Sequence, residues 1–575
     1  MDKLLLGNEA VAAGLLESGC RFVSSYPGTP STEITERAAE YGFYCEWAPN
    51  EKVALEGAVA AAVAGARAFS GMKHVGLNVA ADPLFTASYT GINGGLVVAV
   101  ADDPGMHSSQ NEQDSRHYAL AAKLPMLEPA DSEECRVYTK TAFELSERFD
   151  TPVLLRLSTR VSHSRSPATR GQPQDMPLRE YKKDASKYVM MPAMARARHI
   201  AAEERMKALR DYCETTPLNG ITWGSERKIG VVASGIAYQT AREALGDGVS
   251  YMKLGMVYPL PAESLRRFAS QVDELWVIEE LDDFIEAHCR QHGIKTRGKA
   301  ELSPLGEYSV PQLRRAVFGA DEDTARATPP VAVPGRPPAL CPGCPHRGVF
   351  YVLAKRKVTV FGDIGCYTLA AAPPLSAMDY CLCMGASVSG LHGFLKARPE
   401  AAENSVAVIG DSTFMHSGIT GLLNAVYNNS PVTVLILDNS TTGMTGHQQN
   451  PATGLTLKNE PAPALDIAAL CAALGVRRVC GVDPYDMKAF GVVLARELAA
   501  PEPSVIIAKR PCVLLKHVKK GAFFTLDREK CSDCGLCLKL GCPALKKGEI
   551  DGTLCAGCGL CAAVCGRSAI VGRAL

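Results

Sequence analysis

Short apolar runs alternate with helical patterns along most of the chain, and this alternation predicts α/β sheets with parallel strands. Within residues 1 to about 165, four runs predict one open sheet: 21–24, 74–79, 96–100 and 153–157. Runs at 228–235 and 274–279 predict a second, smaller α/β domain. Runs at 406–412 and 432–437, with a helix through 418–427 between them, predict a third sheet.

Breaks in this pattern predict the boundaries between domains. The stretch 164–177 is rich in Ser, Pro, Arg and Gln, which favours a connector, and a charged helical segment follows at about 195–212. Proline-rich residues 321–338 are typical of a linker. From about residue 522 the chain has many Cys and little aliphatic content, so something other than an apolar core must hold this tail together.

Composition narrows the class of protein. Of 575 residues, 61 are Lys or Arg and 61 are Asp or Glu. This balance gives no global field for nucleic acid or an acidic membrane surface, so neither is expected as a partner. The first apolar run ends after three leucines, and no uncharged apolar stretch is long enough for a membrane helix, so we expect a soluble, cytoplasmic protein. In that reducing compartment, 21 Cys favour metal or cluster ligands over disulfides.

The tail contains two runs of cysteines with the spacing of a two-cluster ferredoxin. Three evenly spaced Cys and a more distant fourth occur twice, and the fourth Cys of each run ligates the other cluster. One [4Fe–4S] cluster is then predicted on Cys531, Cys534, Cys537 and Cys565, and a second on Cys542, Cys555, Cys558 and Cys561. Zinc is the alternative, because C-x2-C pairs also bind it, but the repeated triplets favour clusters. The first run departs from the usual pattern, with four residues instead of three before Cys542.

Polar residues follow two neighbouring strands of the third sheet. Gly410, Asp411 and Ser412 end the first strand, and Asn439 follows the second. Parallel strands bring these residues to one carboxyl edge, where α/β proteins bind ligands. The Asp411 carboxylate, the Asn439 side-chain oxygen and the Thr441 carbonyl suit Mg²⁺. Gly-Asp alone would be read as a turn; with Asn at this distance, the arrangement resembles the thiamine diphosphate motif, with Ser in place of its second Gly.

Two loops upstream of that motif are less specific. The glycine-rich turn at 362–366, which includes Gly365 and Cys366, offers backbone N–H groups for a diphosphate. Cys341 and Cys344 form a C-x2-C pair followed by His346. Their spacing alone fits a redox pair, half a zinc site or a structural loop.

The first domain has two helix starts with polar residues. After the first strand, the loop Tyr-Pro-Gly-Thr-Pro-Ser-Thr-Glu contains Thr29, and places Ser31 or Thr32 to cap the next helix. Further on, Asn50 is a predicted N-cap and Glu51 lies in the first helical turn, where a negative charge is favoured. Taken alone, both features are explained by helix capping.

These motifs, with Ser-Ser-Gln-Asn-Glu-Gln-Asp at 108–114 and the Cys-Pro-Gly-Cys-Pro-His-Arg loop, occur in one order that resembles the alpha subunits of indolepyruvate:ferredoxin oxidoreductases, which belong to the thiamine-diphosphate-dependent 2-oxoacid:ferredoxin oxidoreductases. The resemblance covers essentially the whole chain. It implies multi-domain α/β architecture with doubly wound parallel sheets. The implied domains are a pyrimidine-binding domain (1–185), a helical connector with a transketolase C-terminal-like domain (186–325), a diphosphate- and Mg-binding domain (326–518) and a two-cluster ferredoxin-like domain (519–575).

The resemblance also implies roles for single residues. Glu51 would activate the cofactor, and Thr29 would contact the substrate. His107 and Arg116 would meet a substrate carboxylate or, as the alternative, anchor their loop. Ten residues would surround the cofactor: Cys341, Cys344, His346, Gly365, Cys366, Gly410, Asp411, Ser412, Asn439 and Thr441.

The implied reaction is oxidative decarboxylation of arylpyruvates, namely indolepyruvate, phenylpyruvate and hydroxyphenylpyruvate, to aryl-acetyl-CoA. The implied cofactors are thiamine diphosphate, Mg²⁺ and two [4Fe–4S] clusters, with ferredoxin as electron acceptor and coenzyme A as acyl acceptor. The implied assembly has two alpha and two beta subunits. Two alternatives stay open: a ferredoxin oxidoreductase for an aliphatic 2-oxo acid, and a non-catalytic iron–sulfur electron carrier.

Overall fold

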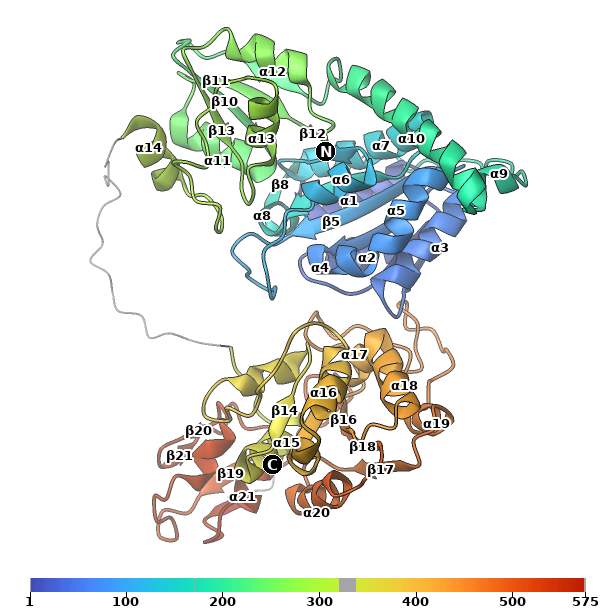
Figure 1. The fold of residues 1–575 in the computed structure, drawn as a ribbon. Coiled ribbons are helices and arrows are strands. Elements are labelled where there is room, and N and C mark those ends of the chain that lie inside the picture. The colour runs from blue at the N-terminus through green and yellow to red at the C-terminus, as the bar shows by residue number, and fades with distance from the viewer. Residues whose placement is uncertain (1, 170, 320–337, 573–575) are drawn as a thin grey trace. The chain divides into compact units, whose positions relative to one another are not determined.

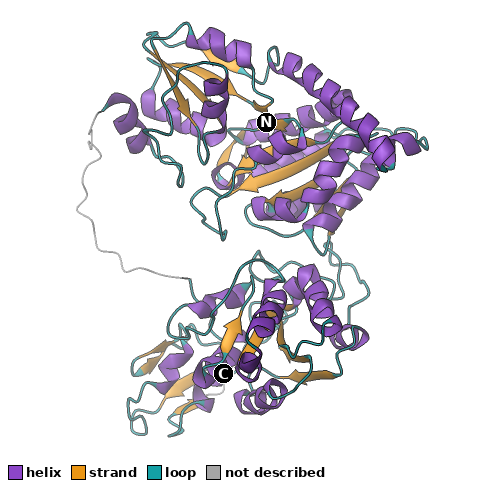
Figure 2. Cartoon of the chain, in the orientation of Figure 1, coloured by secondary structure: helices purple, strands orange, loops and turns teal. Residues whose placement is uncertain are grey.

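The computed structural model describes residues 2–169, 171–319 and 338–572, and the chain divides into two compact units, Met1–Ala332 and Val333–Leu575 (Figure 1). In each unit helices lie on both sides of the strands (Figure 2). The predicted α/β class with parallel sheets is confirmed. The predicted linker at 321–338 lies, except for its last residue, outside the described residues. The division into four domains stays a prediction.

The first unit contains a seven-stranded sheet of order β12-β6-β7-β5-β4-β2-β3 and a four-stranded sheet of order β13-β10-β11-β9. All neighbours in the larger sheet are parallel except β12 and β6. The strands are β1 (Asp2–Leu6), β2 (Phe22–Ser25), β3 (Tyr44–Trp47), β4 (Ala68–Lys73), β5 (Leu96–Asp102), β6 (Met126–Leu127), β7 (Val153–Ser158), β8 (Arg165–Thr169), β9 (Gly220–Thr222), β10 (Ile229–Ser234), β11 (Ser250–Leu254), β12 (Met256–Tyr258) and β13 (Glu274–Ile278).

Fourteen helices among the described residues of this unit cover or connect its sheets. They are α1 (Gly7–Glu17), α2 (Thr32–Ala39), α3 (Glu51–Val63), α4 (His74–Val79), α5 (Ala81–Thr90), α6 (Arg116–Ala122), α7 (Ser132–Phe149), α8 (Thr159–His163), α9 (Ala185–Tyr188), α10 (Pro192–Cys213), α11 (Gly235–Leu245), α12 (Ala262–Ala269), α13 (Phe284–Gln291) and α14 (Val310–Phe318). Helix α10 confirms the charged helical segment.

Two predictions for this unit are wrong. Residues 74–79 form helix α4, and the strand is β4, immediately before it. The Ser and Gly of β4 fit there because β4 pairs on both sides, with β2 and β5, and is buried almost throughout. The connector at 164–177 begins with β8, which pairs antiparallel with β1. Its mostly exposed residues show no alternation of apolar and polar positions, so no pattern in the sequence indicated a strand there.

One hydrophobic core joins the two sheets of the first unit. It contains Leu96 and Val98 of the larger sheet together with Val232, Met252 and Val277 of the smaller one. Because burial of apolar surface is the main stabilising term in folding, this shared core explains why the first two predicted domains form one compact unit.

The second unit contains a five-stranded, all-parallel sheet of order β14-β15-β16-β18-β17. Alternate residues of β15 point to opposite faces: Val406 and Val408 pack with helices α15 and α20, and Ala407 and Ile409 pack with α16 and α18. The strands are β14 (Thr359–Phe361), β15 (Ser405–Gly410), β16 (Thr433–Asp438), β17 (Arg478–Val482) and β18 (Ser504–Lys509). The helices are α15 (His346–Arg356), η1 (Cys366–Ala371), α16 (Ala386–Ala397), η2 (Pro399–Asn404), α17 (Asp411–Thr413), η3 (Phe414–Gly418), α18 (Ile419–Tyr427), α19 (Ile467–Ala473) and α20 (Met487–Leu498).

The cysteine-rich tail packs on this sheet domain with a small core of its own. That core contains Leu540, Leu560, Cys561 and Ile570, with Tyr351 of α15 and Met487 of α20 at its edge. The tail elements are β19 (Phe524–Leu526), η4 (Leu536–Leu540), β20 (Leu545–Lys546), β21 (Glu549–Ile550), α21 (Leu560–Ala563) and β22 (Ile570–Gly572). A core of four buried residues is small for a segment of this length, which agrees with a tail held by bound groups.

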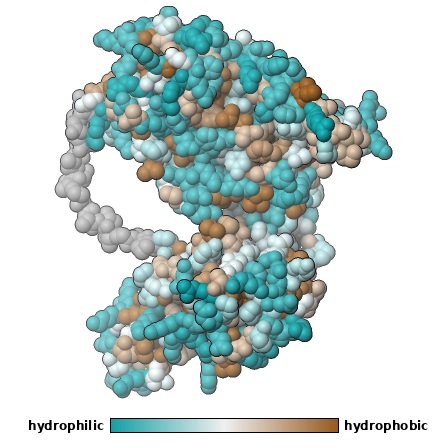
Figure 3. Space-filling model, viewed as in Figure 1, coloured by the Kyte–Doolittle hydropathy of each residue, from teal (hydrophilic) through white to brown (hydrophobic). Residues whose placement is uncertain are grey.

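No helix among the described residues is long and apolar enough to cross a bilayer. The face drawn in Figure 3 is mostly hydrophilic, with apolar residues scattered among the polar ones.

Candidate active site

The carboxyl edge of the five-stranded sheet brings the predicted magnesium ligands together. Gly410 pairs with Leu437, so Asp411 lies beside Asp438, and Asn439 follows directly. The Asn439 side-chain oxygen accepts a hydrogen bond from the Thr441 N–H (3.3 Å). Thr442, next in the chain, donates its hydroxyl to that of Ser412 (3.0 Å). Ser412, at the position of the second Gly of the motif, therefore ties the two loops together.

Asp411 is a buried carboxyl group whose partners are all neutral or negative. Burial raises its pKa to about 7, and the neighbouring Asp438 carboxylate adds to this shift. Among the described residues its side-chain donor is the amide of Asn450 (3.2 Å). Asp438 is paired with Lys509 (3.0 Å), but no ion pair of Asp411 occurs within the described residues. A buried carboxylate with oxygen-rich neighbours and no cationic partner fits a divalent cation, which would favour its charged form.

His346 links the Cys-Pro-Gly-Cys loop to this edge. It begins helix α15, and its Nε2 lies 3.5 Å from the Asn439 side-chain nitrogen. Burial lowers the pKa of His346 to about 4, so the ring is neutral at pH 7. Its ring packs edge-on against Tyr367, whose hydroxyl accepts a hydrogen bond from the Gly410 N–H (2.9 Å). The glycine-rich turn and the C-x2-C loop therefore surround the same edge as Asp411.

Four thiols gather beside this edge, and one of them, Cys512, was not predicted as a site residue. Burial raises the pKa of Cys366 to about 11, and the nearby thiols of Cys512 and Cys341 add to the shift. Burial also raises the pKa of Cys344, to about 12, and the thiols of Cys366 and Cys341 add to that shift. The Cys366 sulfur lies 3.5 Å from the point where a β-carbon on Gly443 would stand, in the loop after Asn439. We call Cys341, Cys344, Cys366 and Cys512 the loop thiol group.

The tail cysteines form two further groups. The thiols of Cys558, Cys555 and Cys542 all add to the shift that burial causes in the pKa of Cys561, so Cys542 lies with the second run. These four also line one small cavity. In the other group, Cys534 and Cys565 influence the pKa of Cys537, and Cys531 lines a cavity together with Cys537. We call them the inner tail group (542, 555, 558, 561) and the outer tail group (531, 534, 537, 565).

The spacing of these thiols bears on the bound group. Among the described residues, which include all 21 cysteines, no three thiols lie within 4.8 Å of one another. Tetrahedral zinc with Zn–S bonds of about 2.3 Å would hold its sulfur ligands about 3.8 Å apart. No three thiols of the described residues have the spacing of such a zinc site.

The C-x2-C loop, which carries two thiols of the loop thiol group, packs directly against the second cysteine run of the tail. A β-carbon on Gly343 would stand 2.7 Å from the Ala556 β-carbon and 3.8 Å from that of Cys558. Tyr485 donates its hydroxyl to the Gly343 carbonyl. Arg347, fully buried, donates to the Leu540 carbonyl in the tail (2.7 Å) and to the Cys341 carbonyl (3.1 Å). The tail is therefore fixed directly against the C-x2-C loop.

In the first unit, Glu51 lies at the carboxyl edge of the seven-stranded sheet. The Asn50 side chain accepts from the Val53 N–H (2.9 Å), which confirms Asn50 as the N-cap of α3. Glu51 is only 4% exposed, and α4 passes so closely that a β-carbon on Gly76 would stand 2.5 Å from its Oε1. Ser31 is at the N-cap position of α2, but its hydroxyl donates to the Gly28 carbonyl (2.8 Å), so a capping role for Ser31 is wrong.

Lys73 lies between the Thr29 loop and Glu51, and was also not predicted. Its side-chain carbons lie 3.4 Å from the position of a β-carbon on Gly28, and its amine donates to the Ser108 carbonyl (2.9 Å). Burial lowers its pKa, while the carboxylates of Asp103 and Glu51 oppose that shift. The Ser108 hydroxyl donates to the Thr29 carbonyl (3.3 Å), so the 104–112 loop covers Thr29.

His107 and Arg116 have different environments. His107 is about half exposed, with its Nε2 3.3 Å from the Glu307 carboxylate. Arg116 is fully buried, and its guanidinium donates to Asp114 and Glu279. Arg116 therefore anchors its loop, the alternative that the sequence left open, and Thr29 and His107 stay predicted substrate contacts.

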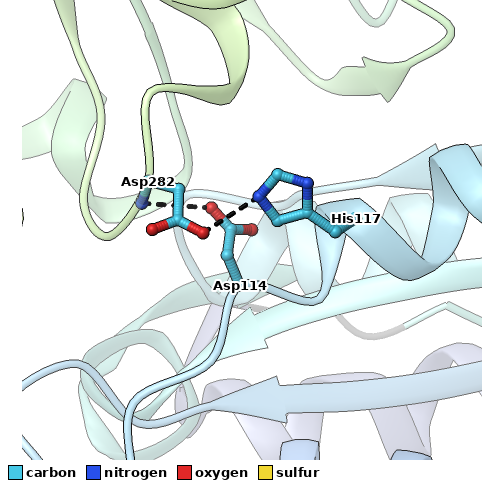
Figure 4. A group of neighbouring side chains, drawn as sticks. All are labelled: Asp114, His117 and Asp282. Carbon is cyan, nitrogen blue, oxygen red and sulfur yellow. Dashed lines mark hydrogen bonds and ion pairs between the residues drawn. The ribbon is translucent and has the colours of Figure 1, made fainter.

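One group of acidic and imidazole side chains in the described residues is close enough for a metal: Asp114, His117 and Asp282 (Figure 4). His117 Nε2 lies 2.9 Å from the Asp282 carboxylate, and the Asp282 N–H points to Asp114 (3.4 Å). Both Asp114 oxygens already accept from Arg116. We therefore interpret this group as a structural contact between the two sheets of the first unit, not as a metal site.

Comparisons with known proteins match the chain over the regions that contain both candidate sites, at the carboxyl edges of the seven-stranded and the five-stranded sheet. The chain matches two protein-family models: "Pyruvate flavodoxin/ferredoxin oxidoreductase, thiamine diP-bdg" over residues 13–215, and "Thiamine pyrophosphate enzyme, C-terminal TPP binding domain" over residues 363–508. The first range contains Glu51 and Thr29, and the second contains Asp411 and Asn439. The fold and the site thus define an oxidoreductase of the thiamine-diphosphate-dependent 2-oxoacid:ferredoxin class.

Curated relatives specify the family. The chain is 42% identical to the indolepyruvate oxidoreductase subunit IorA of Methanothermobacter thermautotrophicus, over 99% of this chain and 97% of the relative. It is 39% identical to the subunit of the same name from Archaeoglobus fulgidus, over 98% and 97%. A 2-oxoglutarate synthase subunit KorA of Archaeoglobus fulgidus is 25% identical over 49% of this chain and 88% of the relative. The chain belongs to the indolepyruvate oxidoreductase subunit IorA family.

Proposed function

We propose that this chain is the thiamine-diphosphate-binding subunit of an enzyme that oxidatively decarboxylates arylpyruvates to acyl-CoA thioesters and passes the electrons to ferredoxin. The observation that supports this most directly is the edge built from Asp411, Asn439 and Thr441, in the same compact unit as three groups of four thiols. The aromatic substrate class rests on the names of the relatives that match nearly the whole chain.

The residues of the two candidate sites would have the following roles. Asp411, Asn439 and the Thr441 carbonyl would bind Mg²⁺, and the glycine-rich turn with Gly365 and Gly410 would hold the diphosphate. Glu51 would hold and move a proton at the pyrimidine ring. When bound, thiamine diphosphate supplies the carbon nucleophile that adds to the 2-oxo group and accepts the electrons left by loss of CO₂.

The electrons would leave through three iron–sulfur clusters instead of the two predicted. The loop thiol group is next to the cofactor edge, and the C-x2-C loop that carries two of its thiols packs against the inner tail group through Gly343. The outer tail group follows, because the two runs of cysteines cross. Two electrons per substrate would pass one at a time along this series to ferredoxin, and coenzyme A would take up the acyl group.

Iron content and EPR test the cluster assignment. Protein purified without oxygen should contain about 12 iron atoms per chain, and Cys512→Ser should lose about four. Cys213→Ser, a change at a buried cysteine of α10 in the first unit, is the matched control and should lose none. About eight iron atoms per chain in both the Cys512→Ser variant and wild type would show that the chain holds two clusters and not three.

Substrate class is tested with the alpha and beta subunits together. Viologen reduction dependent on coenzyme A is measured with indolepyruvate, pyruvate and 2-oxoglutarate in parallel. We expect the highest kcat/KM with indolepyruvate. Activity with pyruvate or 2-oxoglutarate alone would favour an aliphatic substrate, and no activity with any 2-oxo acid would favour a non-catalytic electron carrier.

Glu51→Gln tests the catalytic role of the first unit. Because an amide cannot take up or release the proton, we expect kcat to fall by about 100-fold or more while thiamine diphosphate stays bound. Glu56→Gln is the matched control, since Glu56 is an exposed residue of the same helix paired with Lys52. If Glu51→Gln keeps most of the activity, another group must activate the cofactor.

A further inference from the structure

A basic groove lies between helices α15 and α20 and the cysteine-rich tail. Its volume is about 920 Å³. Four cations line it, Lys355 and Arg356 from α15, Lys488 from α20 and Lys539 from the tail, and no acidic residue does. All four are exposed, and no ion pair forms at any of them within the described part of the chain. The four positive charges therefore repel one another until an anionic partner binds.

The groove is also lined by exposed apolar residues that a bound partner would contact. Val492 is 66% exposed and Leu536 is 40% exposed, and both line it together with Val564. Solvent-exposed side chains of this kind next to cations are typical of a protein–protein contact with an apolar centre and a charged rim.

The position of the groove relates it to electron transfer. Leu536 is the chain neighbour of Cys537, and Val564 is the chain neighbour of Cys565, so the groove reaches the outer tail group. Cys534 of the same group is exposed. Residues 519–575 contain nine Lys and Arg against five Asp and Glu, in a chain whose net charge is zero. The excess of positive charge is therefore concentrated around the predicted exit of the electrons.

We propose that this groove is the docking surface for a small acidic electron-carrier protein. The proposal rests on the proposed function, because a carrier is needed only if electrons leave through the tail. Cys531, Cys534, Cys537 and Cys565 would hold the outer cluster, which would supply one electron to the oxidised carrier per encounter, so that two encounters would follow each 2-oxo acid oxidised. The cations attract the carrier's carboxylates, and the apolar residues bring its redox centre close to Cys537 and Cys565.

Coenzyme A, which is also anionic, fits the groove less well. Helix α15 begins at His346, beside the cofactor edge, and ends at Arg356, in the groove. At 1.5 Å per residue these residues are about 15 Å apart, with the buried middle of the helix between them. Coenzyme A must deliver its thiol to the cofactor edge, whereas an electron carrier needs only the outer tail group.

The test uses the complete enzyme of alpha and beta subunits, loaded with iron, and a purified acidic [4Fe–4S] ferredoxin. For the triple variant Lys355→Glu, Lys488→Glu and Lys539→Glu we expect the KM for ferredoxin to rise at least about tenfold at low ionic strength, with most of its salt dependence lost. Viologen reduction and the KM for coenzyme A should not change. Lys396→Glu is the matched control, because α16 lies on the opposite face of the sheet, and it should leave the KM for ferredoxin unchanged.

Direct binding of ferredoxin to the same preparations separates this proposal from the proposed function, because binding needs no turnover. Weaker binding by the triple variant supports the docking surface even if no 2-oxo acid is oxidised. Equal binding and equal KM in wild type and triple variant would overturn it. A rise in the KM for coenzyme A instead would assign the groove to coenzyme A, and a parallel fall in viologen reduction would assign the lysines to the support of the clusters.

Discussion

Glu280 is a buried carboxyl group just after β13, facing both sheets of the first unit. Burial raises its pKa from 4.5 to about 7; the carboxylates of Glu307 and Glu128 add to this shift, and the Tyr308 N–H and Arg156 oppose it. Between these two pH values the folded protein keeps a proton that the unfolded chain has lost. The free energy of unfolding therefore falls as pH rises from about 4.5 to 7, and the loss is complete above that window.

Glu280→Gln should remove this pH dependence, because the amide is neutral throughout. We expect the variant to match wild type near pH 4.5 and to exceed it by about 2 to 3 kcal/mol at pH 8. All three tryptophans, Trp47, Trp223 and Trp276, lie in the first unit, so their fluorescence during denaturation reports on this unit. Glu243→Gln, at an exposed position of α11, is the control. A variant that loses stability in parallel with wild type would show that Glu280 is not the responsible group.

At the scale of elements, the close passage of α4 over α3 sets the position of Glu51. A β-carbon on Gly76 would stand 2.5 Å from Glu51 Oε1 and 2.8 Å from its Cγ, so Gly76→Ala must displace the carboxylate. Since misplacement of a catalytic group by about 1 Å costs on the order of 100-fold, we expect kcat to fall by about that factor. Thiamine diphosphate binding, measured by cofactor content, should be unchanged.

Gly393→Ala is the matched control for that substitution. Gly393 is also helical, in α16, but no atom lies within 4 Å of the position of its β-carbon. Alanine favours the helix there by up to about 1 kcal/mol and should leave kcat unaffected. If Gly76→Ala keeps kcat within a factor of two, Glu51 does not depend on α4 for its position.

The sequence predicted those elements whose structure depends mainly on residues close together in the chain. Continuous apolar runs such as that of β5 and the cap at Asn50 depend on neighbouring residues only, and both are confirmed. The strand β4 was missed because its Ser and Gly are acceptable only between two other strands. Lys73, the last residue of β4, was missed with it, because it lies directly before the run 74–79 that was interpreted as the strand. Cys512 has no neighbouring cysteine in the sequence, and only the folded chain brings it to Cys341 and Cys366.

At the scale of the molecule, the contact between the C-x2-C loop and the tail joins the proposed cofactor edge to the proposed electron exit. Gly343 has a φ of 73° and leaves no room for a side chain, since a β-carbon would stand 2.7 Å from that of Ala556. Gly343→Ala should therefore cost about 1 to 2 kcal/mol in backbone strain and also push the tail away from the loop. The strain alone is reproduced by Gly319→Ala, where φ is 64° in the left-handed helical region and no atom of the described residues lies within 4 Å of the β-carbon position.

Rapid mixing of the enzyme with 2-oxo acid and coenzyme A should separate these two effects. In wild type and Gly319→Ala we expect the clusters to bleach together, because the three thiol groups are in close succession. In Gly343→Ala the loop thiol group should bleach at the wild-type rate, and the two tail groups should follow in a second, slower phase, with iron content unchanged. Bleaching of all three groups in one phase would show that electrons reach the tail by a route that does not pass through the Gly343 contact.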